Sequence, residues 1–331
     1  MTTSPALNTQ VTHMNKQTKI IVIGGATACG KTDAAVNLAL EIGGEIISAD
    51  SMQVYRGMNI GTNKPSEAEM CGIKHYLIDE REPDEGFSVA DFSELAAKYV
   101  DEITAKGKTP IICGGTGFYI NALLRGNDFP DGGRDDDYRN ELYSLAENQG
   151  NVALHELLRQ NDSASAAVID KNNVKRVVRA LEFYKQTGTT ISSHNALQRA
   201  KPPKYDAKIF LLGVDREKLY LRINSRVDEM VKHGLFEEVA ELLEKGYSRS
   251  LTSMQGIGYK EVAEYLAGEL SKDECIEKIK RGTRHYAKRQ MTWFSRQIDN
   301  SIWLDVTNAA SAENITNMYI NVPESTGGEI T

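Results

Sequence analysis

Residues 25–32 show the clearest chemistry in the chain. They read GATACGKT, so Gly25 and Gly30 flank four residues and are followed by Lys31 and Thr32. Glycines allow backbone angles that turn N–H groups onto an anion, and the start of a helix adds partial positive charge. Lys31 can neutralise a terminal phosphate, and the Thr32 hydroxyl can ligate Mg²⁺. The segment is a P-loop pattern and predicts a site for a nucleotide such as ATP, or for another di- or triphosphate. The predicted diphosphate- or nucleotide-binding residues are Gly25, Ala26, Thr27, Ala28, Cys29, Gly30, Lys31 and Thr32.

Asp50 is the second residue that can do chemistry, because it ends an apolar run at residues 45–49. A carboxylate beside a phosphate site can accept a proton from an attacking nucleophile. Alternatively, Asp50 could cap a helix N-terminus or hydrogen-bond to the ligands of a magnesium ion, and the pattern does not decide between these roles. Asp79 ends another apolar run and is a weaker candidate for the metal site. Thr116 lies between glycines, so it either faces a cleft or serves a tight turn.

Two basic clusters stand out in a chain of 331 residues with a net charge of −7. One lies at residues 171–179, and the other, at 278–296, contains seven Lys or Arg side chains. Such clusters suit a nucleic-acid backbone, although a solvated helix face is the alternative. Arg222 and Arg226 are four residues apart and share one helix face. They could hold a pyrophosphate, or they could pair with acids such as Glu217 and Asp228.

Short apolar runs that alternate with helical patterns position these residues. We expect strands at 19–23, 45–50, 76–79, 110–113 and 208–214, a helix at 89–104 and a long helix at 273–294. This order predicts an α/β fold with a parallel, doubly wound sheet, and such sheets bind ligands beyond the carboxyl ends of their strands. Thr32, Asp50, Asp79 and Thr116 are all expected near those ends.

Residues 125–200 differ from the rest because no strand-like run interrupts their helical spacing. We therefore expect an α-helical insertion at 125–200 within a P-loop catalytic core made of 18–124 and 201–306. The polar segment 1–17 is expected to be a disordered tail, and 307–331 a weakly ordered one.

The composition fits a globular protein without a membrane segment. Hydrophobic residues make up 40% and charged residues 26% of the chain, and no apolar run approaches the roughly 20 residues that cross a bilayer. The first residues lack the apolar stretch of a signal peptide. Four cysteines lie far apart without zinc-type spacing, so we expect reduced thiols and a cytoplasmic location.

Eight segments between residues 19 and 296 together resemble the bacterial tRNA dimethylallyltransferase family, also called isopentenyl-tRNA transferases. They are GATACGKT (25–32), ISADSMQVYRGMNIGTNKPS (47–66), FSVADF (87–92), GGTGFYINALL (114–124), KRVVRALE (175–182), RINSRVDEM (222–230), TSMQGIGYKE (252–261) and YAKRQMTWF (286–294).

The resemblance implies transfer of a dimethylallyl group from dimethylallyl diphosphate to N6 of the adenosine 3′ of the anticodon in tRNA, with release of diphosphate. It implies a P-loop core redirected to prenyl transfer, a helical insertion that grips the anticodon stem-loop, and Mg²⁺ as cofactor. By position, Asp50 is the general base, Arg226 assists the diphosphate, Thr116 belongs to the catalytic set, and Thr32 is the metal ligand. The implied tRNA-binding residues are Asp50, Ser51, Met52, Gln53, Thr116, Arg139, Lys175, Arg176, Val177, Val178, Arg179, Gln255, Gly256, Ile257, Gly258, Tyr259 and Lys260. A monomer is expected.

The chain departs from the family pattern at two places. Ala26 and Cys29 stand where the family usually has Pro and Ser, and Asp170-Lys171 replaces a histidine–proline pair. Two other functions compete with prenyl transfer. A small-metabolite kinase with Asp50 as base leaves the insertion and the basic clusters unexplained. A nucleotide-dependent RNA-binding switch gives Asp50 and Arg226 no task.

Overall fold

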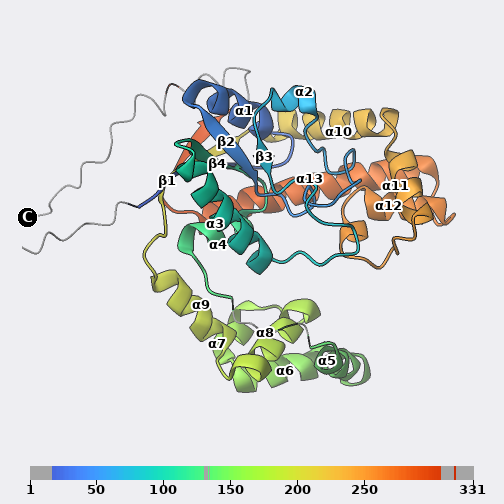
Figure 1. Cartoon of the computed structure of the whole chain (residues 1–331). Coiled ribbons are helices and arrows are strands. Elements are labelled where there is room, and N and C mark those ends of the chain that lie inside the picture. The colour runs from blue at the N-terminus through green and yellow to red at the C-terminus, as the bar shows by residue number, and fades with distance from the viewer. Residues whose placement is uncertain (1–16, 130–132, 134, 307–316, 318–331) are drawn as a thin grey trace, which may run out of the picture. The chain divides into compact units, whose positions relative to one another are not determined.

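The computed structural model describes residues 17–129, 133, 135–306 and 317 (Figure 1). The two expected tails, 1–17 and 307–331, lie outside the described residues except for Gln17 and Asn317. Internal contacts divide the chain into two compact units. The first unit comprises the residues up to 86, 98–120 and those from 204 onward, and the second comprises 87–97 and 121–203.

A parallel sheet forms the centre of the first unit. Within the described residues its strands follow the order β3-β2-β4-β1-β5-β6, and every neighbouring pair is parallel. The α/β fold with a P-loop-type core predicted from the sequence is therefore confirmed. The strands are β1 (Lys19–Gly25), β2 (Gly44–Ser48), β3 (His75–Tyr76), β4 (Thr109–Gly114), β5 (Asp206–Gly213) and β6 (Ser301–Asp305).

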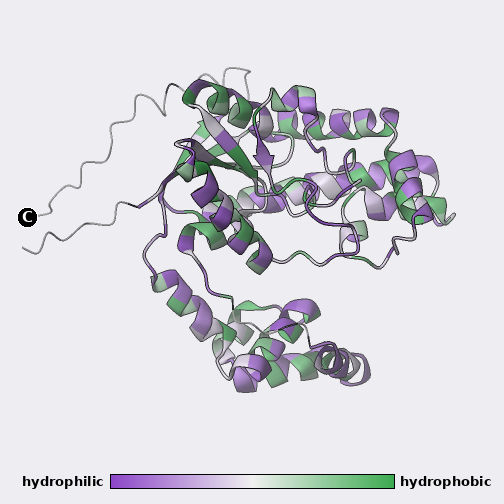
Figure 2. Cartoon of the chain, viewed as in Figure 1, coloured by the Kyte–Doolittle hydropathy of each residue, from purple (hydrophilic) through white to green (hydrophobic). Residues whose placement is uncertain are grey.

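The central strand β1 is buried on both faces, which explains its continuous apolar run (Figure 2). Ile21 and Ile23 pack with the buried side of helix α1 (Lys31–Ile42) and with Phe210 of β5. Gly24 points to the opposite face, where a Cβ would lie only 3.0 Å from the ring of Phe294. The sheet thus lies between α1 and the helix that carries Phe294.

That helix is α13 (Lys272–Gln297), the long helix expected near residues 273–294. Ser271 caps its first turn in a capping box with Glu274, which explains where it begins. The other helices with all their residues in the first unit are α2 (Glu67–Met70), α10 (Arg216–Lys232), α11 (Leu235–Glu244), α12 (Tyr259–Leu266) and the 3₁₀ turn Ser253–Gln255. Helices α3 (Val89–Ala105) and α4 (Gly117–Arg125) have residues in both units.

Two strands differ from the sequence expectation. The third strand is only two residues long because Leu77 and Asp79 adopt positive φ angles of 60° and 55°, which end the extended backbone. Strand β6 was not predicted. It is a short edge strand that keeps Trp303 44% exposed, so it lacks the continuous apolar run of a buried strand. No helix within the described ranges is long and apolar enough to cross a membrane.

The second unit contains helices throughout residues 136–200. They are α5 (Asp136–Gln149), α6 (Asn151–Asn161), α7 (Ser163–Val168), α8 (Val174–Thr187) and α9 (Ile191–Ala200). Leucines 154 and 158 of α6 pack with Val177 and Val178 of α8 in one apolar cluster.

A buried carboxylate, Glu182 on α8, joins α8 to α5. Both of its oxygens accept hydrogen bonds from Arg139 at 2.6 and 2.8 Å, and it also accepts from Arg179 and from the Asp135 N–H. Burial alone would raise the pKa of Glu182, but the bonds from Arg139 and Arg179 outweigh it and lower this pKa to about 2. Two arginines of the second unit therefore have a structural partner.

We predict that Arg139→Met lowers the free energy of unfolding by about 3 kcal/mol, because it leaves a buried carboxylate without its bidentate partner. The matched control is Arg159→Met, since Arg159 forms an exposed pair with Glu156 and should change stability by less than about 1 kcal/mol. Urea denaturation of the full chain at pH 7 measures both effects. Equal losses in the two variants would contradict this role of Arg139.

The same pair predicts a pH dependence. Because the folded pKa of Glu182 is depressed, its stabilising contribution is complete above the unfolded pKa near 4.5 and is lost as the pH falls toward about 2. The difference in stability between the parent protein and Glu182→Gln should shrink over that range. A constant difference from pH 6 to pH 2.5 would show that the carboxylate charge is not what stabilises the unit.

Candidate active site

The P-loop follows β1 and leads into α1. Gly25 has φ 151°, and a Cβ there would lie 2.8 Å from the Leu212 carbonyl oxygen. Gly30, at φ 87°, occupies the position before the first turn of α1. Ala28 also has a positive φ of 65°. These angles turn the backbone around the helix N-terminus, which is the arrangement that binds anions.

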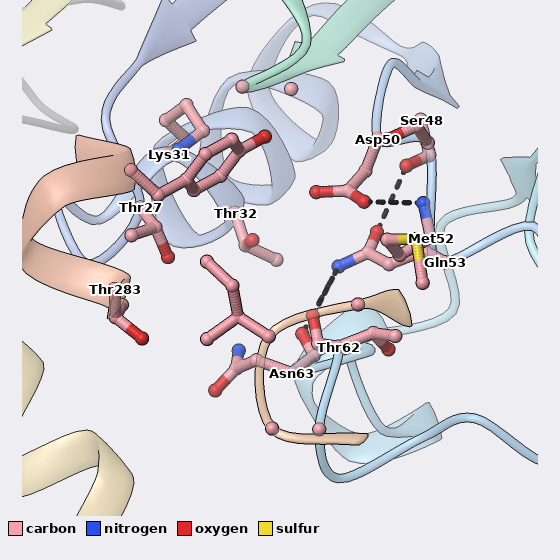
Figure 3. A pocket seen from close by; sticks show the side chains of 18 of the residues that line it. Thr27, Lys31, Thr32, Ser48, Asp50, Met52, Gln53, Thr62, Asn63 and Thr283 are labelled. Carbon is pink, nitrogen blue, oxygen red and sulfur yellow. Dashed lines mark hydrogen bonds between the residues drawn. The ribbon is translucent and has the colours of Figure 1, made fainter. Parts of the chain in front are cut away.

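Polar side chains from several strand ends line one cavity of about 360 Å³ in the first unit. Thr27, Lys31 and Thr32 lie on one side of it, and Asp50 lies on another (Figure 3). The Lys31 ammonium donates to the Ala26 carbonyl at 2.6 Å. The cavity therefore brings cationic P-loop groups and a carboxylate into one space.

Asp50 lies in the turn after β2. Its Oδ1 accepts the Met52 N–H at 2.8 Å, while its other oxygen points toward the part of the cavity near Thr32 (Figure 3). Burial raises the pKa of Asp50 above its ordinary value, and the Met52 N–H and the nearby Lys31 charge oppose the rise only in part. A carboxylate with a raised pKa is a better proton acceptor than an exposed aspartate.

Thr116 ties the turn after β4 to the turn that carries Asp50. Its N–H donates to the Ala49 carbonyl at 3.1 Å, and its hydroxyl accepts the Ser51 N–H at 3.2 Å. The neighbouring glycine permits this approach, because a Cβ on Gly114 would lie 2.2 Å from the Ala49 oxygen. Thr116 itself does not line the cavity, so these contacts fit the tight-turn interpretation, and its place in the catalytic set stays a prediction.

Gln53 and Met52 line the cavity wall beside Asp50. Gln53 accepts from the Ser48 hydroxyl at 2.9 Å and donates to the carbonyls of Thr62 and Asn63 at 3.4 and 3.2 Å. Its amide therefore links β2 to the loop at residues 59–63, of which residues 61–63 line the next part of the cavity (Figure 3).

Glu238 on α11 binds the backbone of that loop. Its carboxylate accepts the N–H groups of Asn59, Ile60 and Gly61 between 2.8 and 3.1 Å. It also accepts the Tyr259 hydroxyl at 2.6 Å. Tyr259 is fully buried, and residues 255–259 also line the cavity. Of the expected run 255–260, Lys260 does not line it.

The two arginines of α10 have different surroundings. Arg226 lines the cavity, and burial lowers the pKa of its guanidinium. Arg222 does not line the cavity and donates instead to the Val306 carbonyl at 3.3 Å. The two arginines therefore do not clamp one ligand, and the expected acid Asp228 pairs with Lys280. Asp79 also lies outside the cavity lining and pairs with Lys64.

Many lining residues were not proposed for the site from the sequence, and five of them have polar side chains and come from β3 and α13. His75 comes from β3; Thr283, Tyr286, Arg289 and Gln290 come from α13. Burial and the nearby Asp50 carboxylate raise the pKa of Tyr286 to about 12, although Thr116, Arg289 and Gln290 oppose the rise, so its phenol is neutral at physiological pH. Tyr286, Arg289 and Gln290 belong to the YAKRQMTWF segment, but its helical spacing suggested core packing. His75 and Thr283 lie in none of the eight segments, so no sequence signal indicated them.

The predicted tRNA-binding residues of the second unit have different environments. Lys175 and Arg176 are exposed on α8, whereas Arg139 and Arg179 bond to Glu182. Val177 and Val178 are buried in the apolar cluster, so their side chains pack the helix rather than offer a surface. Only part of the KRVVR segment is therefore available to a ligand in this structure.

The parallel sheet, the P-loop and the cavity at the strand ends define an α/β protein of the P-loop class. Residues 53–297 match the family model described as IPP transferase. A relative from Acetivibrio thermocellus named tRNA dimethylallyltransferase is 52% identical over 296 residues, which cover 89% of this chain and 94% of the relative. The chain belongs to the IPP transferase family, so the family predicted from its motifs is confirmed.

Solved structures agree with this assignment. The full-length tRNA isopentenylpyrophosphate transferase of Bacillus halodurans is 42% identical with a TM-score of 0.69, and the match covers 92% of this chain and 96% of that one. A eukaryotic dimethylallyltransferase acting on tRNA is 29% identical with a TM-score of 0.77, covering 93% and 80%. These similarities do not favour the kinase alternative.

We predict that Arg226→Ala weakens the binding of inorganic diphosphate by about 10- to 100-fold, the effect of losing one charge-assisted contact. Arg222→Ala is the matched control on the same helix and should change the Kd by less than about threefold. Isothermal titration calorimetry with Mg²⁺ and diphosphate measures both. A larger loss in Arg222→Ala than in Arg226→Ala would contradict the separation of the pair.

Proposed function

We propose that this protein transfers a dimethylallyl group from dimethylallyl diphosphate to N6 of the adenosine that follows the anticodon in tRNA. The observation that carries the proposal is the shared cavity, in which a partly buried carboxylate, Asp50, lies across from the P-loop. Membership of the IPP transferase family supports the same reaction.

In the proposed reaction the adenine N6 attacks C1 of the allyl group while the bond from C1 to the diphosphate oxygen breaks. The N6 proton passes to Asp50, because an exocyclic amine is a weak nucleophile until it loses a proton. The P-loop amides, Lys31 and Arg226 stabilise the negative charge that grows on the leaving diphosphate. The adenine must leave the anticodon stack to reach this cavity.

Thr32 is the residue that fits a magnesium ion. It is the first-turn hydroxyl of α1, it lines the cavity beside Lys31, and a hydroxyl oxygen is a ligand that Mg²⁺ accepts. Among the described residues no cluster of three His, Cys, Asp or Glu side chains could hold a metal by itself. The phosphate oxygens of the substrate would therefore supply further ligands, and the ion would neutralise part of their charge.

Basic side chains on two helices support tRNA as the acceptor. Lys175 and Arg176 extend from α8, and a second hollow of about 560 Å³ runs along α13. Its basic lining residues are His285, Lys288, Arg289 and Arg296, and Trp293 lies beside them. Cations around an aromatic surface suit the phosphates and bases of a stem-loop. Cytoplasmic action as a monomer remains our expectation for this enzyme.

The decisive test is the mass of the nucleosides in tRNA after incubation with the enzyme, Mg²⁺ and dimethylallyl diphosphate. We expect adenosine to gain one dimethylallyl group. Asp50→Asn should lower the single-turnover rate by about 10²- to 10⁴-fold while the affinity for tRNA stays within about twofold. An unmodified adenosine, or phosphorylation of a small metabolite instead, would refute the proposal.

The raised pKa of Asp50 adds a pH dependence. Only the carboxylate accepts a proton, so the single-turnover rate should fall with decreasing pH, with a midpoint above the ordinary aspartate value of about 4. This acid limb should disappear in Asp50→Asn. An unchanged limb in that variant would assign it to another group.

Binding of the anticodon stem-loop should weaken steeply with salt, by about 0.7–0.9 in log–log slope for each phosphate contact. The double variant Lys175→Ala/Arg176→Ala should lower the slope by about one to two units and leave diphosphate binding unchanged. Arg159→Ala, an exposed arginine paired with Glu156, is the control. Binding that does not depend on salt would exclude these contacts.

A further inference from the structure

Gln290, on α13, uses both ends of its side-chain amide in one buried contact. Its Oε1 accepts the Thr27 N–H of the P-loop at 2.8 Å, and its Nε2 donates to the Gly115 carbonyl at 3.0 Å. The residue is only 6% exposed. One side chain therefore connects the loop after β1 with the turn after β4.

The chemistry of this position is specific. The Thr27 N–H needs an acceptor and the Gly115 carbonyl needs a donor, and a neutral amide supplies both. An ionised carboxylate of the same length could only accept, and a methionine could do neither. Gly115 leaves the space, because a Cβ there would lie 2.1 Å from Nε2 of Gln290.

The residue after Gly115 extends the contact toward Asp50. The Thr116 hydroxyl accepts the N–H of Ser51, the residue after Asp50. The Thr116 N–H donates to the carbonyl of Ala49, the residue before Asp50. The bond from Gln290 to Gly115 therefore connects the P-loop, through the next peptide unit, with the turn that carries the proposed base.

We propose that Gln290 is a positioning residue that sets the P-loop, where the diphosphate binds, against the turn that carries Asp50. The inference rests on the proposed prenyl transfer. Gln290 touches neither the reacting carbon nor the amine in this scheme. It fixes the separation between leaving group and base, and an error of about 1 Å in such a separation can lower a rate by about 10²-fold.

The test compares Gln290→Met, which keeps length but removes both hydrogen bonds, with Gln160→Met, the same change at an exposed position on α6. Single-turnover transfer is measured at saturating dimethylallyl diphosphate and stem-loop. We expect Gln290→Met to be slower by about 10- to 100-fold, with kcat falling more than the KM for either substrate changes. Gln160→Met should transfer at the parent rate.

A merely structural role predicts a different result. In that case the melting temperature would fall and the rate per folded molecule would stay within about twofold of the parent, which would overturn the inference. A loss confined to the KM for dimethylallyl diphosphate would also overturn it. Failure of the parent protein to modify tRNA would instead refute the proposed function, so the two failures are distinguishable.

Gly115→Ala displaces the same amide from the other side. If both changes act through the contact between Gln290 and Gly115, the double variant Gly115→Ala/Gln290→Met should be no slower than the slower single variant. Losses that multiply in the double variant would show two independent effects and contradict the proposed contact.

Discussion

The site depends on the close approach of backbone segments at the carboxyl ends of neighbouring strands. The turn after β4 lies so near the turn after β2 that a Cβ on Gly114 would lie 2.2 Å from the Ala49 oxygen. On the other side, Gly115 and Gly117 would place a Cβ 2.1 Å from Gln290 and from Trp293 of α13. Glycine at these positions brings Thr116 within hydrogen-bond distance of Ser51. Larger residues there would separate the segments that form the cavity.

The second requirement of the site is electrostatic. In the proposed reaction, Asp50 shares a cavity with cationic groups and the diphosphate, yet it must remain basic enough to accept a proton. Burial raises its pKa, while the charge of Lys31 lowers it only in part. The Lys31 ammonium is itself directed toward the P-loop by the Ala26 carbonyl. In this scheme the carboxylate of Asp50 accepts the proton, and the ammonium of Lys31 neutralises phosphate charge.

Sequence patterns predicted the strands and helices whose hydrophobic residues follow a regular spacing. They missed features that depend on contacts between distant parts of the chain. The buried run of β1 and the helical spacing of α13 were recognisable because periodicity alone specifies them. Strand β6 escaped notice because it is a short edge strand with an exposed tryptophan. Gln290 carries no motif chemistry of its own, and its role arises only from the two backbone groups that it meets in the fold.

The number of Lys and Arg residues in α13 suggested a nucleic-acid partner, but it did not show which of these side chains face a ligand. Of the α13 cluster, Lys278 and Lys280 pair with Glu264 and Asp228, and Arg284 donates to Asn224 at 2.6 Å. These partners come from other helices, so the sequence spacing gives no sign of them. Whether a basic residue stabilises the fold or faces a ligand is decided by its tertiary neighbours.

Ala26 and Cys29, where the P-loop departs from the family pattern, lie in a part of the site that depends on the backbone rather than on side chains. In the proposed scheme the diphosphate binds largely to backbone N–H groups of the P-loop, whose positions depend on φ and ψ rather than on side chains. Ala26 and Cys29 are buried, and the Cys29 sulfur lies 3.9 Å from the Lys31 nitrogen. A small side chain at these positions keeps the same backbone. The acceptor side is made of side-chain oxygens and amides, such as Asp50 and Gln53, where a change of residue type removes the group itself. We therefore expect a change of side chain at residue 26 or 29 to affect the proposed reaction less than a change at Asp50 or Gln53.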